Sequence, residues 1–369
     1  MKLRFVFLAA ATALAPVASH AWDYEGHRIV NQIALAALPS DFPAFVKAPA
    51  NAERVAFLAG EPDRWRNVPD LPLKQYNGMD HYCDLEQITD AGLSYATLPS
   101  LRYDFAAKFA AGRTAHVDKF PDIDETKNQD HSHEWCGFAP WAITEYFGKL
   151  RASFSYLKVF EETDAGTHRP LGTPEEIANA QANVVYLMGV MGHYVGDCAQ
   201  PLHTTVHHNG WVGTNLHDYT TWPGIHGWID GGFIGKAGIK AADLTPRATP
   251  AAVIPLAPRE DGRDTMFVAV IDYLLAQNKL VEPLYQMEKA GKFAHAKDEV
   301  PTAEGRAFIE KQLLVGGEEL AAIWTTAWKS SVPDNYLRAS LIKREGGTVS
   351  VKSGDDAAPA KKKKKKGMP

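Results

Sequence analysis

Residues 173–203 read TPEEIANAQANVVYLMGVMGHYVGDCAQPLH, and this stretch decides how the rest of the chain is interpreted. It opens with a capping box, Thr173 to Glu176, with a proline in the first turn, and it predicts a helix that ends near Pro201. His193 and Asp197 are four residues apart, so on this helix their side chains share a face with Cβ atoms roughly 5–6 Å apart. The stretch therefore predicts a long helix that brings an imidazole and a carboxylate to one place.

A second pair of the same kind follows at His226 and Asp230, and His203 stands just after the predicted helix end. One such pair is more often an ordinary solvated pair than a set of metal ligands. Two pairs joined by a further histidine favour a metal site, because zinc binds imidazole nitrogen and carboxylate oxygen, and catalytic sites mix these ligands while leaving a position for water. The pattern predicts a metal-dependent hydrolase.

Residues 1–21 are typical of a secretory signal peptide. Lys2 and Arg4 precede an apolar run from 5 to 17, and small residues stand at the two positions that a signal peptidase reads before Trp22. The apolar run is short for a transmembrane anchor, so we expect cleavage and export, to the periplasm or the medium. Cleavage would leave Trp22 as the N-terminus, with a free amino group that can chelate a metal together with His27.

The chain resembles a superfamily of mostly helical three-zinc phosphodiesterases. It comprises the fungal single-strand-specific nucleases (the S-one/P-one nuclease family), plant bifunctional nucleases and bacterial zinc phospholipase C. Members begin with a tryptophan that binds zinc through its amino nitrogen and carbonyl oxygen. The matching positions, in the order of the family, are Trp22, His27, Asp63, His81, His193, Asp197, His203, His226 and Asp230. They extend over residues 22–234, and residues 235–344 carry no motif that matches.

The resemblance implies three Zn²⁺ ions, and it assigns these nine residues to them. Asp63, His81, His193 and Asp197 would hold the first ion; Trp22, His27 and the bridging Asp197 the second; His203, His226 and Asp230 the third. The implied activity is hydrolysis of single-stranded DNA, RNA and 3′-nucleotides to 5′-phosphate products by a zinc-bound hydroxide, with Asp63, Arg66 and Asp197 as catalytic residues.

The resemblance also assigns substrate contacts. Arg66 stands where the nucleases place an arginine, and its planar guanidinium suits the charge that develops on phosphate oxygens; a surface ion pair is the alternative. Tyr82 would stack on a base and Asp84 would bond to the edge of the base. Stacking tolerates every base, as a sequence-indifferent nuclease requires. Simple core packing is the alternative role of Tyr82.

Two other functions stay open. In zinc phospholipase C an acid that binds the choline head group stands where this chain has Glu25, and phospholipid would then be the substrate. The interval from His203 to His226 matches the longer nuclease spacing and favours the nuclease. A noncatalytic zinc-binding protein would need a further ligand that closes the site. Nine ligands shared among three ions leave room for water, which favours catalysis.

The fold class that we predict is all-α, a single multi-helix domain over residues 22–344. Apolar residues at helical spacing predict helices over 25–38, 138–162, 264–290 and 303–329. Segments 60–80, 112–137 and 204–235 are rich in glycine and proline and are expected to form loops at the rim of a cleft. The histidines in these loops that match no family ligand are expected to be solvated; they are His131, His133, His207, His208 and His217.

The composition changes after Arg344, and residues 345–369 are expected to form a disordered, lysine-rich tail. The chain carries −5 at pH 7; because the tail contributes +4 and the leader +2, the body carries −11. The lysines could recruit polyanions to this acidic body, or the tail could have no function.

Of Cys83, Cys136 and Cys198 at most two can pair, and the spacing does not indicate which. Nothing in the sequence indicates an oligomeric state.

Overall fold

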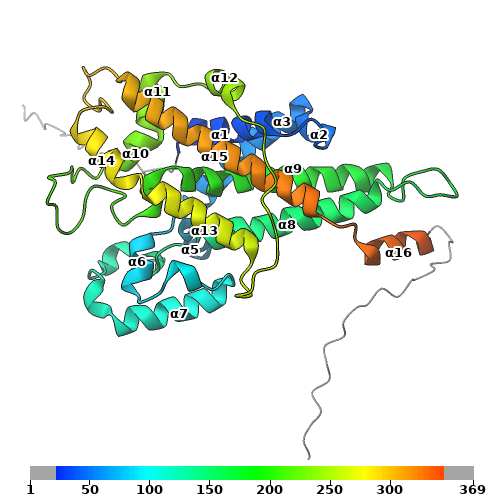
Figure 1. Cartoon of the computed structure of the whole chain (residues 1–369), viewed down its shortest axis with the longest axis horizontal. Coiled ribbons are helices and arrows are strands. Elements are labelled where there is room, and N and C mark those ends of the chain that lie inside the picture. The colour runs from blue at the N-terminus through cyan, green and yellow to red at the C-terminus, as the bar shows by residue number, and fades with distance from the viewer. Residues whose placement is uncertain (1–21, 345–369) are drawn as a thin grey trace, which may run out of the picture.

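Helix α9 (Pro174–Ala199) runs through the middle of the computed structural model, which describes residues 22–344 (Figure 1). Its first turn forms the predicted capping box: the Thr173 hydroxyl accepts a hydrogen bond from the Glu176 backbone N–H, and the Glu176 carboxylate accepts one from the Thr173 N–H. The helix ends directly before Pro201, which cannot continue an α-helical hydrogen-bond pattern. The central helix therefore begins and ends as the sequence predicts.

The other elements are helices as well, and residues 22–344 contain no β-strand, only an isolated bridge between Thr163 and Pro170. The longer helices are α1 (Tyr24–Ala37), α3 (Pro49–Leu58), α5 (Leu71–Met79), α7 (Arg102–Ala115), α8 (Ala139–Phe160), α13 (Thr265–Asn278), α14 (Val281–Lys289), α15 (Ala303–Ser330) and α16 (Asn335–Arg344). The short helices are α2 (Ala44–Lys47), α4 (Glu61–Arg66), α6 (Leu85–Asp90), α10 (Ile225–Gly227), α11 (Phe233–Ala237) and α12 (Ala241–Leu244). The remaining turns are η1 (Tyr95–Thr97), η2 (Val117–Lys119), η3 (Glu125–Lys127), η4 (Ser132–Glu134), η5 (Pro201–Thr204), the π-helical η6 (Trp228–Gly232) and η7 (Thr245–Arg247).

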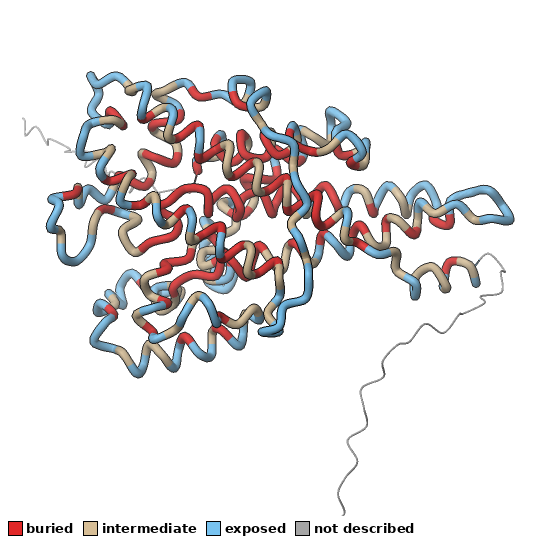
Figure 2. The backbone as a smooth tube through the Cα atoms, viewed as in Figure 1, coloured by how far each residue is buried: buried red, intermediate tan, exposed pale blue. Residues whose placement is uncertain are grey.

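The core lies where α1, α8 and α15 pack around α9. Figure 2 shows buried residues along the middle of these helices, whereas the far end of the α8–α9 pair and the extended segment between α12 and α13 are exposed. Leu313, Leu320 and Trp324 on α15 are fully buried, and burial of one such side chain contributes about 1.5–3 kcal/mol. The all-α, single-domain prediction is confirmed.

A glycine sets the distance between α1 and α9. A Cβ atom on Gly192 would lie 1.7 Å from the Asn31 side-chain oxygen, so no other residue fits there. The Asn31 amide donates hydrogen bonds to the carbonyls of Val55 and Gly189, which ties α1 to α3 and α9. This close approach brings the first turns of α1 against the last turns of α9, where His193 and Asp197 lie.

Three predictions about local structure were wrong. The helix expected over 264–290 is interrupted between α13 and α14, because Pro283 has no N–H to donate to the carbonyl of Lys279 and its ring would clash with that carbonyl. Segment 60–80 contains α4 and α5 rather than a loop, since Pro62 and Pro72 both stand in first turns, where proline begins a helix. Segment 204–235 likewise contains α10, η6 and the start of α11.

The predicted signal peptide and lysine-rich tail lie outside the described residues. Within 22–344, none of the helices combines the length and the apolar character that a membrane crossing demands.

Candidate metal centre

The last turns of α9 and the first turns of α1 form the first half of the site. His193 and Asp197 lie on α9, and His27 lies on α1; all three are completely buried. His27 Nε2 is 3.4 Å from Asp197 Oδ1, and the His27 and His193 rings stack with centroids 3.7 Å apart. Ligand atoms of these residues are close enough to hold one metal ion.

A second group meets the first at His193. His81 follows α5, and its Nδ1 lies 2.8 Å from His193 Nε2 and 3.1 Å from Asp197 Oδ2. Asp63, on α4, places its Oδ1 3.8 Å from His193 Nε2 and 3.9 Å from His81 Nδ1. Asp63, His81 and His193 therefore form a second group that could hold an ion.

Asp197 stands between these two groups. Its Oδ1 faces His27, whereas its Oδ2 faces His81 and His193 at 3.1 and 3.3 Å. One carboxylate thus presents a separate oxygen to each group, which is the arrangement that a bridge between two cations requires.

The third group is built from short turns. His203 is on η5, His226 on α10 and Asp230 on the π-helical η6. His226 Nε2 lies 2.9 Å from Asp230 Oδ2 and 3.0 Å from His203 Nε2. Gln200 is fully buried and donates a hydrogen bond to the other oxygen of Asp230 at 2.7 Å, while its own oxygen accepts one from the Leu202 N–H.

Backbone carbonyls fix the orientation of two imidazoles. His193 Nδ1 lies 2.6 Å from the Ala59 carbonyl oxygen, and His203 Nδ1 lies 2.9 Å from the His81 carbonyl oxygen. Because a carbonyl only accepts, Nδ1 carries the proton in both rings and the Nε2 lone pair points into the site. Proteins commonly orient histidine ligands of metals in this way, by a hydrogen bond from the ring nitrogen that does not bind the metal.

The buried polar atoms fit metal ions and fit little else. Burial lowers the pKa of His27, His81 and His203, and lowers that of His193 to about 4, so these imidazoles are neutral as ligands must be. Burial also raises the pKa of Asp197 and Asp230. Buried ligand atoms without a hydrogen-bond partner are both nitrogens of His27, both oxygens of Asp197, and one nitrogen each of His81 and His226. Such unpaired groups are costly unless a cation binds them.

Trp22 lies at the same place, although the structure assigns no ligand atom to it. Its ring is fully buried, and its indole N–H donates a 2.7 Å hydrogen bond to the carbonyl of Gly196, the neighbour of Asp197. The Asp23 N–H donates to the carbonyl of Asp230. The start of the described chain is therefore held between the groups that contain Asp197 and Asp230.

Residues of the second and third groups border a cavity of about 980 Å³. His81, His203 and His226 line it, as do Arg66, Tyr82 and Asp84. Arg66 Nη2 is 2.8 Å from Asp63 Oδ1. Asp84 is buried, which raises the pKa of its carboxyl, and its Oδ1 has no hydrogen-bond partner. All nine predicted ligands except Trp22 thus contribute atoms to the three groups, and the predicted substrate residues lie beside them.

Several cavity residues were not predicted from the sequence. His133, His207 and His208 line the cavity, although their loops suggested solvated side chains. Arg113, Phe120 and Trp135 from segment 112–137 also line it. Proximity of His207 and His208 to His203 in the sequence was the available signal, whereas nothing marked Gln200. Glu25 is exposed on α1 and is not among the residues that line the cavity.

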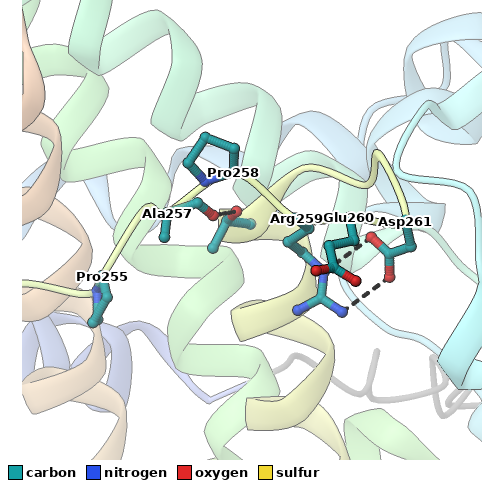
Figure 3. Close-up of a pocket in the computed structure, with 7 residues that line it drawn as sticks. Pro255, Ala257, Pro258, Arg259, Glu260 and Asp261 are labelled. Carbon is teal, nitrogen blue, oxygen red and sulfur yellow. Dashed lines mark hydrogen bonds and ion pairs between the residues drawn. The ribbon is translucent and has the colours of Figure 1, made fainter.

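A second pocket lies on the extended segment before α13 (Figure 3). Arg259 and Asp261 form an ion pair there at 2.9 Å, and the pocket contains none of the candidate ligands. The candidate ligands that line a pocket, among the described residues, therefore belong to the first cavity. Searches with protein-family models and against curated protein sequences give no match for this chain.

Proposed function

We propose that the protein is an exported zinc-dependent phosphodiesterase of the nuclease type, which cleaves single-stranded DNA or RNA and 3′-nucleotides and leaves 5′-phosphate products. The observation that carries the proposal is Asp197, whose two oxygens face two different groups of ligands. A third group stands at the same cavity. Three ions around one cavity would suit a reaction in which both the attacking and the leaving oxygen need stabilisation.

The donor set matches zinc. Each group combines imidazole nitrogen with carboxylate oxygen, which zinc accepts readily. The nine residues would hold three ions as the family resemblance implies, with His193 assigned to the first ion because its Nε2 faces His81. The ions would supply Lewis acidity and would lower the pKa of water at the site.

The protein side chains would orient the substrate. Arg66 would bond to the phosphate, and Asp63 at 2.8 Å holds its guanidinium beside the ligands. Tyr82 would stack on a base, and Asp84 would contact the base edge with its buried, unpaired oxygen. The cavity volume, about 980 Å³, is at the upper end of the range for small-molecule sites and is large enough for more than one nucleotide.

The alternatives receive less support. Glu25 would have to face the cavity in order to bind a choline head group, and it is exposed on α1 instead. A noncatalytic zinc-binding protein should enclose its ions, whereas His81, His203 and His226 border an open cavity. Export would supply the free amino group at Trp22, which the second ion needs.

The test compares the metal-free and zinc-loaded mature protein on single-stranded DNA, RNA, a 3′-nucleotide and phosphatidylcholine vesicles. We expect zinc to restore cleavage of the first three. Tyr82→Ala should weaken nucleic-acid binding by about 1–3 kcal/mol, whereas Tyr76→Ala, outside the cavity, should not. Faster hydrolysis of phosphatidylcholine than of nucleic acid, with no effect of Tyr82→Ala, would replace the nuclease by a phospholipase. No zinc-dependent hydrolysis of any substrate would leave only the zinc-binding function.

A further inference from the structure

Two segments of the cavity wall run side by side and bring two cysteines together. The Asp84 N–H donates to the carbonyl of Cys136 at 2.6 Å, and the Ala139 N–H donates to the carbonyl of Tyr82 at 3.2 Å. Between them Gly137 has a φ of +90°, and a Cβ there would lie 2.1 Å from the Tyr82 carbonyl oxygen. Only glycine permits this approach, so the backbone holds Cys83 and Cys136 next to each other.

Both cysteine side chains are fully buried where the two segments meet. Burial raises the pKa of the Cys136 thiol, and a hydrogen bond with Cys83 raises it further. The remaining cysteine, Cys198 on α9, is buried too, and the pKa of its thiol is raised by burial and by the nearby Asp197 and Cys83, but within residues 22–344 no backbone hydrogen bond ties α9 to the segment of Cys83 or to that of Cys136.

We propose that Cys83 and Cys136 form a disulfide bond when the chain folds in the presence of a disulfide oxidant, and that this bond fastens one wall of the cavity to the strip that carries His81 and Tyr82. The two thiols lose two electrons and two protons and gain one Sγ–Sγ bond. The oxidant, a disulfide such as oxidised glutathione, takes up both and becomes two thiols. The proposal does not depend on the bound metal or on the reaction.

The burial of the pair determines when the bond forms. Thiol–disulfide exchange requires a thiol that an oxidant can reach, and both thiols are inaccessible in the folded protein. The bond therefore forms during folding and afterwards resists reduction. It acts as a structural fastening, not as a reversible switch.

The cross-link would close a loop over residues 84–135, which carries α6, α7 and the wall residues Arg113, Phe120 and Trp135. A loop of this length restricts the unfolded chain considerably, so the oxidised protein should melt higher by roughly 5 °C or more. This fastening would also hold Trp135 in place relative to Tyr82.

The test uses the full mature chain, unfolded and then refolded with zinc in a glutathione buffer that is mostly oxidised. After denaturation we expect one alkylatable thiol in place of three, and peptide mapping should find Cys83 linked to Cys136. Refolding under reducing conditions should lower the Tm by the amount given above. Cys198→Ser, the matched control, should keep both the link and the Tm difference, whereas Cys83→Ser and Cys136→Ser should abolish both.

Three results would overturn the proposal: three free thiols after oxidative refolding, a link that involves Cys198, or glutathione adducts in place of the cross-link. Thiol counting and peptide mapping on the wild-type chain decide between these results, even if a serine variant does not fold.

Discussion

The two halves of the metal centre are built in different ways. The helix half consists of His27, Asp63, His81, His193 and Asp197, and its key residues lie on the long helices α1 and α9. The turn half consists of His203, His226 and Asp230, which lie on η5, α10 and η6. A helix places its ligands by regular spacing, whereas the turns need outside support, and Gln200 supplies it through its hydrogen bond to Asp230.

This difference predicts how each half fails. In the helix half one carboxylate, Asp197, serves two groups, so a single change should damage both. In the turn half Asp230 serves one group, so a comparable change should remain local. The predictions below use this contrast, from the largest expected effect to the smallest.

The largest effect is expected for Asp197→Asn. A neutral amide is a poor bridge between two dications, so the variant should lose at least one zinc ion and activity on the order of 10³-fold or more. Asp230→Asn should lose only the ion of the turn half. Elemental analysis and kinetics on both variants measure this. Full activity of Asp197→Asn would show that the carboxylate is no bridge.

The second prediction concerns the start of the mature chain. If the amino group of Trp22 is a ligand, one additional methionine before it should displace that ligand and reduce activity on the order of 10²-fold or more. The Trp22 ring and its bond to Gly196 should stay in place, so the Tm should change little. Mass spectrometry establishes each N-terminus. Equal activity of the two forms would remove Trp22 from the site.

The third prediction is for Arg66→Ala. If Arg66 bonds more strongly to the phosphate in the transition state, turnover should fall on the order of 10²-fold while zinc content stays constant. Arg64 lies on the same helix, where it pairs with Glu61, and provides the matched control. An equal loss in Arg64→Ala, or a loss of zinc in Arg66→Ala, would mean that the residue acts on the structure of α4.

The fourth prediction concerns Gln200, which holds Asp230 in the turn half of the metal centre. Gln200→Ala removes the donor to Asp230 and the acceptor for the Leu202 N–H. We expect one zinc ion to bind about 10–100-fold more weakly and the other two to bind as before. Isothermal titration of the metal-free protein resolves this, with Gln181→Ala, at the exposed end of α9, as control. If all three ions weaken together, the two halves are not independent.

The fifth prediction concerns pH and the metal-free protein. Folding keeps the pKa of His193 at about 4, below its ordinary value of 6.5. Between these values the unfolded chain binds the proton and the folded protein does not, so stability present above pH 6.5 is lost as the pH falls towards 4, by about 3 kcal/mol in all. We expect His193→Gln to remove this part of the pH dependence of the free energy of unfolding, which urea unfolding at several pH values measures. His168→Gln, in an exposed loop, should keep it; an unchanged slope in His193→Gln would contradict the assignment.

The same contrast explains what the sequence could predict. The α9 helix was predictable because Thr173, Glu176 and Pro201 mark its ends and because i,i+4 spacing places His193 and Asp197 on one face. The π-helical geometry at Asp230 and the contact from Gln200 were not, since both depend on how distant turns pack. Pro283 did signal the break between α13 and α14, but the apolar spacing on either side hid it.

Longer-range features escaped for the same reason. The family resemblance implied that Asp197 bridges two ions, but the approach of α1 to α9 at Gly192, which places its two oxygens towards separate groups, is revealed only by the fold. His133 and His208 reach the cavity because segments 112–137 and 204–235 both contribute to its wall. Local patterns thus predicted which residues matter, and tertiary packing decides what each one faces.

Anomalous diffraction at the zinc edge, on crystals of the zinc-loaded protein that begins at Trp22, tests the central claim most directly. We predict three peaks: one in contact with Asp197 Oδ1, one in contact with Asp197 Oδ2 and one in contact with Asp230 Oδ2. A single peak, or the absence of any peak beside Asp197, would contradict the two-sided role of this carboxylate.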